Sequence, residues 1–425
     1  MNARRILPFV VLACLAGPAL GDGAFPDVLS VYLPASSPNR IMLGTNFGLV
    51  ISDDGGQSWR FICELFITTS GADLVNYYKV GSDGSIIAVT YVNLWRSSDG
   101  GCSWTRGGGS VASLDVADAF IDPNDPTFVL AIATDASGSG IYPSHDGGLT
   151  FGTAVYHTPD LLTGVEIAQS DPKIIYATQV HPATGPTGGA YLLKSVDRGA
   201  TWSSQLLQIS SATTPRIAGV DPADATTVYL RLLALTASTD ALAVTTDDGK
   251  TLRTMVTLTG STYFTSFLRA GDRTLYAGTS SADLYVEPPG VAAFSKRVGP
   301  RARCLGQRPG TSRIFACGDS FLDGYSLGYS DDGANTFTPL MKFTDIVGPL
   351  TCPAVKNACD VQYQILQQTL GVTDAGAPPD AGNVTPKPRG SHCGTVGGSG
   401  SAALAGLLAW LASRRRARRA CRSAA

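Results

Sequence analysis

The octapeptide SSDGGCSW (residues 97–104) joins three hydroxyls, a carboxylate and two glycines to a tryptophan, and close variants of it recur along the chain. SDDGGQSW (52–59) lies upstream, and SHDGGLTF (144–151), SVDRGATW (195–202), TTDDGKTL (245–252) and SDDGANTF (330–337) lie downstream. We call this eight-residue unit the box. Successive boxes start 45, 47, 51, 50 and 85 residues apart, so the last step is nearly two periods. The strand-like segment 274–298 fills that interval, which predicts seven units.

Each unit has the same internal order of apolar segments and turns. In the third unit, residues 116–122 precede an Asp-Pro turn, the apolar segment 128–134, a polar loop, residues 141–144 and the box. The order strand, turn, strand, loop, strand, box, strand describes one four-stranded antiparallel blade whose edges are covered by its neighbours. Repeats of this length are typical of β-propellers. We therefore expect an all-β fold, a seven-bladed β-propeller, over residues 22–372.

The residue types of the box are those that stabilise a tight hairpin turn. Ser or Thr at position 1 and Asp at position 3 accept hydrogen bonds from backbone N–H groups. Gly at position 5 permits a positive φ, and the aromatic residue at position 8 can bury its ring between blades. Six copies argue against catalysis, because an active site needs one asymmetric constellation. The box is interpreted as structural.

The positions assigned to this structural role are Ser52, Asp54, Gly56, Trp59, Ser97, Asp99, Gly101, Trp104, Ser144, Asp146, Gly148, Phe151, Ser195, Asp197, Gly199, Trp202, Thr245, Asp247, Gly249, Ser330, Asp332 and Phe337. Box 5 ends in Leu252, and box 6 has Ala334 at position 5.

The pattern S-x-D-x-G-x-[ST]-[WF] resembles the BNR or Asp-box repeat of sialidases, xyloglucanases, sortilin-type receptors and photosystem assembly factors. The resemblance covers residues ~25–345 and implies the propeller fold. In those families the boxes lie away from the ligand site, so the resemblance leaves the function open.

Catalytic signatures are sparse. A sialidase would need three clustered arginines, a Tyr–Glu pair and an acidic proton donor, yet PNRIMLGTN (38–46) offers Arg40 alone, which we interpret as a turn residue. The only glutamates are Glu64, Glu166 and Glu287. Glu166 falls in an expected inner strand and can line a central channel. A glycosidase that uses two aspartates stays open.

Charge and histidine content exclude other classes. Ten of the 32 basic residues and two of the 34 acidic residues lie outside residues 22–373, so the body has ten more acidic than basic residues. Such a body repels phosphate backbones, and we expect no nucleic-acid partner. The four histidines show no metal-binding spacing. No cofactor or metal is expected.

Both chain ends are expected to direct export. Residues 1–21, with two arginines, an apolar stretch and Ala19-Leu20-Gly21, predict a secretory signal peptide; a rival reading uses Cys14 as a lipoprotein acceptor. Residues 373–392 predict a disordered linker. Residues 393–425 contain an apolar segment (394–412) that is interrupted by Gly and Ser and followed by an arginine cluster.

This C-terminal segment resembles the myxobacterial C-terminal sorting segment (MYXO-CTERM). The resemblance implies processing by a sorting protease near Cys393 and display on the cell surface. The alternative is a simple membrane anchor through residues 394–412.

Six cysteines remain in the body, and an even number in an exported chain predicts three disulfides. Fifteen connectivities are possible. We favour Cys63–Cys102 between the first two blades, Cys304–Cys317 across the last blade's inner hairpin, and Cys352–Cys359 in the tail.

A ligand surface is expected on one face. The Asp-Pro turns and the boxes lie on one face, here called the box face, and the B–C and D–A connections lie on the other, the loop face. Loops on a rigid ring are the usual binding surface. The loop-face candidates are Asn46, Phe47, Tyr91, Asn93, Asp135, His181, Asp240, Asp283, Phe321, Asp323 and Tyr325.

The sequence thus favours an exported, surface-anchored binding or scaffolding module for a glycan or protein ligand. The alternatives are a sialidase- or xyloglucanase-like hydrolase and a sortilin-like peptide receptor.

Overall fold

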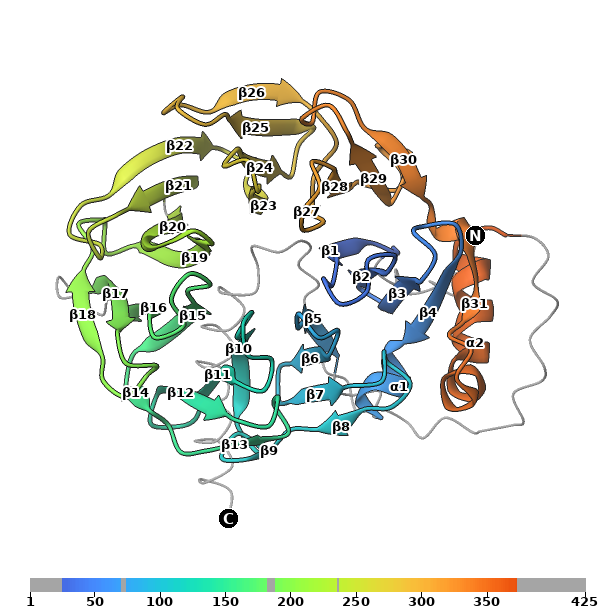
Figure 1. Cartoon of the computed structure of the whole chain (residues 1–425), viewed down its shortest axis with the longest axis horizontal. Coiled ribbons are helices and arrows are strands. Elements are labelled where there is room, and N and C mark those ends of the chain that lie inside the picture. The colour runs from blue at the N-terminus through green and yellow to red at the C-terminus, as the bar shows by residue number, and fades with distance from the viewer. Residues whose placement is uncertain (1–24, 70–73, 182–187, 235–236, 373–425) are drawn as a thin grey trace, which may run out of the picture.

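The computed structural model describes residues 25–69, 74–181, 188–234 and 237–372. Seven sheets surround a common axis like the blades of a propeller (Figure 1). Each blade has four main strands, A to D, that follow one another in chain order, and neighbouring strands among these four pair antiparallel. The prediction of a seven-bladed propeller with four-stranded antiparallel blades is confirmed.

Blades 1 to 3 consist of β1 (Val28–Tyr32), β2 (Ile41–Thr45), β3 (Gly48–Ser52) and β4 (Trp59–Cys63); β5 (Val75–Val80), β6 (Ile86–Thr90), β7 (Leu94–Ser97) and β8 (Thr105–Arg106); and β10 (Asp115–Ile121), β11 (Val129–Thr134), β12 (Ser139–Ser144) and β14 (Tyr156–Thr158). Blades 4 and 5 consist of β15 (Leu161–Ile167), β16 (Ile175–His181), β17 (Gly189–Ser195) and β18 (Ser203–Leu206); and β19 (Thr213–Asp221), β20 (Asp224–Ala234), β21 (Thr239–Thr245) and β22 (Arg253–Thr259).

Blades 6 and 7 consist of β23 (Phe264–Arg269), β24 (Leu275–Thr279), β25 (Asp283–Glu287) and β26 (Ser295–Val298); and β27 (Cys304–Gln307), β28 (Ile314–Cys317), β29 (Leu327–Ser330) and β30 (Thr338–Met341). A short parallel pair, β9 (Gly108–Gly109) and β13 (Thr150–Phe151), links blades 2 and 3. The first strand of each blade lies innermost (Figure 1), and β27 of the last blade contacts β1 of the first.

The chain continues beyond the seventh blade into three further elements, two of which are helical and were not part of an all-β expectation. After the short 3-10 helix η1 (Phe343–Asp345), strand β31 (Ile346–Pro349) pairs in parallel with β4, so blade 1 has a fifth strand. Helix α2 (Pro353–Thr369) then packs against β4 and β31 (Figure 1). Helix α1 (Glu64–Thr68), which follows β4, contacts α2. The C-terminal elements therefore cover the outer edge of the first blade, where an unpaired strand would otherwise be exposed.

Among the described residues three disulfides form, as predicted, but two of the favoured pairings are wrong. Cys304 pairs with Cys317 as expected. Cys63, at the end of β4, instead bonds Cys359 in α2, and Cys102, in the second box, bonds Cys352 immediately before α2. The chain wraps back on blade 1, which brings the C-terminal cysteines beside partners about 250 and 296 residues away. These two bonds attach α2 to the first two blades.

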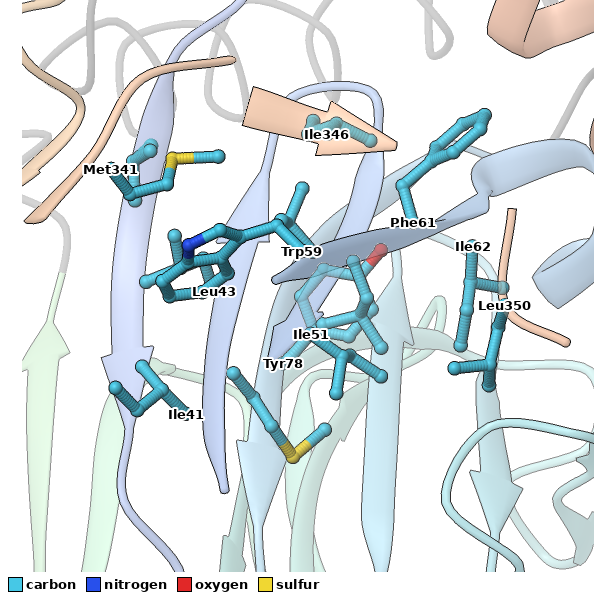
Figure 2. Close-up of a cluster of buried hydrophobic side chains, with 14 of the residues drawn as sticks. Ile41, Leu43, Ile51, Trp59, Phe61, Ile62, Tyr78, Met341, Ile346 and Leu350 are labelled. Atoms are coloured by element: carbon cyan, nitrogen blue, oxygen red, sulfur yellow. The ribbon is translucent and has the colours of Figure 1, made fainter. Parts of the chain in front are cut away.

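Apolar packing continues from blade 7 into blade 1 and the C-terminal elements. Trp59 of β4 lies beside Met341 of β30 in a cluster that also contains Ile346 and Leu350 (Figure 2). Trp59 is 1% exposed. Removing such a side chain costs about 3–5 kcal/mol, so this junction stabilises ring closure without a shared strand.

The expected signal peptide (1–21), linker (373–392), sorting segment (393–425), Cys393 and membrane segment (394–412) lie outside the described residues, and these expectations stay predictions. Within the part of the chain that the structure describes, no helix is long and apolar enough to cross a membrane.

Candidate functional site

All six boxes form the same hydrogen-bonded turn. The hydroxyl at position 1 donates to the carboxylate at position 3 over 2.7–2.9 Å and accepts the N–H of position 5 over 2.8–2.9 Å. The same carboxylate accepts the N–H and the hydroxyl of position 7, at 2.8–3.0 Å and 2.5–2.7 Å. Each box carboxylate is thus engaged within its own turn.

The hydroxyl at position 7 also stabilises the turn, a role that the sequence pattern did not predict. Every box has Ser or Thr there, and that hydroxyl gives the carboxylate its shortest hydrogen bond. In the first box, hydrogen bonds from Ser58 and Ser52 hold the pKa of Asp54 well below its ordinary value. The sequence did carry a signal for this role, because all six boxes have Ser or Thr at position 7.

Position 5 needs a small residue for two reasons. The glycines there have φ between 89° and 100°, and Ala334 adopts 64°. A Cβ on Gly101 would also lie 2.2 Å from the side chain of Ile62 in the preceding blade. The turn conformation and the close approach of the neighbouring blade therefore favour glycine together.

The residue that closes each box packs toward the preceding blade. The Trp202 ring of blade 4 lies 5.8 Å from the Tyr156 ring of blade 3. Leu252 of blade 5 packs against a cluster with residues of blades 4 and 5, and Phe337 of blade 7 packs against a cluster with residues of blades 6 and 7. Trp59 and Phe151 are buried, whereas Trp104, Trp202, Leu252 and Phe337 are half-buried. The closing residues connect adjacent blades.

Blade 6 lacks a box, and a carboxyl replaces the first hydroxyl. Glu287 pairs with Leu275 in the register in which Ser195 pairs with Ile175. Burial raises the pKa of Glu287, and its Oε2 atom has no hydrogen-bond partner among the described residues. The blade forms nonetheless, because its strands still pack in the ring.

The structure places most of the loop-face candidates in local contacts. Phe47 packs edge-on against Phe343 at 5.2 Å, Tyr325 is 7% exposed, and Asn93 is fully buried. Asp135 accepts hydrogen bonds within its own turn, and Asp323 pairs with Arg301.

The other charged candidates have partners on neighbouring strands or connections. Asp240 pairs with Arg231, Asp283 with Lys296 and His181 with Asp160. Tyr91 is 50% exposed, but these residues lie on different blades and do not converge.

Asn46 and Phe321 do converge, at a cleft on the loop face, which we call the loop-face cleft. Its volume is about 600 Å³, and it is lined by Phe25, Pro26, Asp27, Leu29, Asn46, Arg231, Tyr263, Phe264, Thr265, Arg303, Asp319, Ser320 and Phe321. These residues come from blades 1, 5, 6 and 7. The Asn46 amide donates to Phe25 O and its carbonyl accepts from Asp27 N, so it holds the segment before β1 in place.

Apolar side chains are exposed beside this cleft. Phe321 is 65% exposed and its ring lies 3.9 Å from that of Phe25, which is 40% exposed. Leu29 and Leu322 are 45% and 66% exposed. Exposed apolar side chains that gather at one cleft mark an interaction site.

The charged groups of the loop-face cleft compensate one another. Arg303 contacts both Asp27 and Asp319, and Arg231 binds Asp240 at 2.7 Å. Burial raises the pKa of Asp27, although Arg303 opposes the shift. Burial works against ionisation of Asp319 as well, but the N–H groups of Leu322 and Phe321 keep its pKa below the ordinary value. Neither arginine is left free to capture a substrate carboxylate.

The candidate acid Glu166 lies elsewhere, on inner strand β15. Its Oε1 atom accepts Val220 N–H at 2.8 Å. Burial raises its pKa to about 7; the hydrogen bond from Val220 and the Lys79 cation oppose this shift, whereas the Asp118 carboxylate adds to it. Asp118 accepts from Tyr77, Ala119 and Val165, so its carboxylate oxygens are already engaged.

Comparisons with known proteins support the fold. No protein-family model matches the chain, and no curated protein matches its sequence. Prolyl oligopeptidase B from Galerina marginata superposes with a TM-score of 0.53 and 12% identity over 75% of this chain and 50% of that chain. The extracellular domain of the putative one-component system BT4673 from B. thetaiotaomicron gives 0.51 and 9% over 75% and 42%.

YCF48 from Cyanidioschyzon merolae gives a TM-score of 0.49 and 16% identity over 68% of this chain and 92% of that chain. The chain spans about half the length of the other two similar structures. At these identities, the two structures with TM-scores above 0.5 show the β-propeller fold alone.

Proposed function

We propose that this chain is an exported, surface-displayed propeller that binds an apolar segment of a protein ligand in the loop-face cleft and catalyses no reaction. The exposed apolar group of Phe25, Leu29, Phe321 and Leu322 at a cleft of about 600 Å³ carries the proposal. The charged groups beside the cleft already form ion pairs with one another, so apolar contact is the main interaction that a ligand can make there.

Export and repeat type belong to the same proposal. Three disulfides within one chain favour an oxidising compartment. The common turn of the six boxes supports membership of the BNR or Asp-box class. The signal peptide and the MYXO-CTERM-like segment would place residues 22–372 outside the cytoplasm.

The test is binding of the exported chain to an array of 12-residue peptides that vary in apolar and aromatic content. Phe321→Ser should weaken the tightest peptide by about ten-fold or more, because burial of one Phe contributes about 1.5–3 kcal/mol. Val298→Ser, which removes an 85% exposed side chain on β26, is the control and should bind as the parent does. Equal binding by Phe321→Ser would refute the site, and selective binding on a parallel glycan array would refute the ligand class.

A hydrolase is the second candidate because Glu166 is a half-buried carboxyl on an inner strand with a pKa of about 7, suited to a general acid. Fluorogenic glycosides test this directly. Turnover that Glu166→Gln abolishes would favour the hydrolase, and its absence across sialosides and β-glucosides would favour binding.

A further inference from the structure

A second cleft lies on the box face, between blades 7 and 1. This box-face cleft has a volume of about 440 Å³, and the residues that matter here are Pro38, Asn39, Arg308, Ser312, Arg313 and Asp331. It is formed by the A–B turns of the two blades and by the box of blade 7. It is separate from the loop-face cleft in both its residues and its face.

The box-face cleft has a surplus positive charge. The charge of Arg313 is neutralised by Asp331, to which it donates two hydrogen bonds of 2.7 Å. Its guanidinium carbon lies 4.0 Å from the centre of the Tyr329 ring. Asp331 is the one acidic residue among those lining the cleft. Arg308 has no carboxylate partner within the described part of the chain, where the carbonyl of Pro38 is its single acceptor. Burial and the nearby Arg313 cation both lower the pKa of Arg308.

Uncharged hydrogen-bond donors line the same cleft as the Arg308 guanidinium. The Asn39 amide and the Ser312 hydroxyl are exposed at the cleft and make no side-chain hydrogen bond to any described residue. A guanidinium provides several N–H donors in a planar fork that matches the oxygens of an anion. One uncompensated guanidinium with neighbouring amide and hydroxyl donors is the composition of an oxyanion site.

We propose that the box-face cleft binds a sulfate or phosphate group through Arg308, with Asn39 and Ser312 as further donors. The volume exceeds that of the free ion, so a sugar ring that carries the ester also fits. The proposal concerns the face opposite the proposed protein-binding cleft and does not depend on that function.

The experiment is isothermal titration calorimetry of the full exported chain with sodium sulfate, sodium phosphate and glucose 6-sulfate at low ionic strength. Arg308→Gln should weaken binding by about ten-fold or more, the effect of losing charge-assisted hydrogen bonds. Arg273→Gln, an exposed arginine in the A–B turn of blade 6, is the matched control and should leave binding unchanged.

Asp331→Asn provides a test by gain of affinity. It removes the carboxylate that neutralises Arg313, so anion binding should tighten by several-fold. A sugar sulfate that binds much more tightly than inorganic sulfate would identify a glycan ester as the source, and equal affinities would identify the free ion. Absence of binding in the parent chain, equal loss in Arg273→Gln, or weaker binding in Asp331→Asn would overturn the proposal.

Discussion

At the scale of single residues, each box depends on one buried hydroxyl that bridges a carboxylate and a backbone N–H. Ser195 is 1% exposed, donates to Asp197 and accepts from Gly199 N. The sequence could predict these partners, because short polar side chains bind nearby backbone groups. It could not predict how closely position 5 approaches the preceding blade, since that distance depends on the packing between blades.

Ser195→Ala should lower the free energy of unfolding by about 1–3 kcal/mol, because it leaves the N–H of Gly199 without its acceptor. Ser195→Thr is the control, since Thr245 fills the same position in box 5. Urea unfolding of the three proteins measures the difference. A loss as large for the threonine variant would contradict the role of the hydroxyl.

Glu166→Gln should remove a pH dependence of stability. The folded chain keeps Glu166 protonated up to its pKa of about 7, whereas the unfolded carboxyl ionises near 4.5. The folded state binds more protons in this window, so the stability of the parent falls as the pH rises from about 4.5 to about 7.

Thermal unfolding of parent and variant across pH 4–8 tests this expectation. The difference in melting temperature between the two proteins should change through that window and level off above it. A constant difference would show that Glu166 ionises alike in both states.

At the scale of elements, local pairings were predictable from the sequence and distant ones were not. Cys304 and Cys317 face each other directly in the hairpin of β27 and β28, so spacing alone favoured their bond. The partners of Cys352 and Cys359 lie on blades at the other end of the chain. Their pairing follows from ring closure and from α2, and strand periodicity carries no information on either.

The two long-range disulfides should hold α2 on the ring. The double change Cys63→Ser and Cys102→Ser should make the segment around α2 sensitive to limited proteolysis, because the covalent links to blades 1 and 2 are lost. In the chain-entropy account, a disulfide that closes a long loop stabilises the folded protein more than one that closes a short loop, and a typical contribution is about 2–4 kcal/mol.

Cys304→Ser with Cys317→Ser is the control, since that bond closes a separation of 13 residues within blade 7. Mass spectrometry of the first cleavage products identifies the segment released. Cleavage around α2 at the parent rate in the Cys63 and Cys102 variant would show that packing on β4 and β31 is sufficient.

At the scale of the whole molecule, periodicity predicted the number of blades, including the blade without a box. It did not predict the loop-face cleft, whose lining residues come from four blades and from the segment before β1. The sequence could assign loops to a face, but most of the candidate side chains turned out to bind their own neighbours. Which loops converge depends on the ring as assembled.

The most direct test of the account is hydrogen–deuterium exchange of the full chain with and without its tightest array peptide. A peptide bound in the loop-face cleft should slow exchange at residues 25–29, 46–47 and 318–325, which surround that cleft, and leave exchange in the six boxes unchanged. Protection centred on the boxes, with residues 25–29 and 318–325 unaffected, would contradict it.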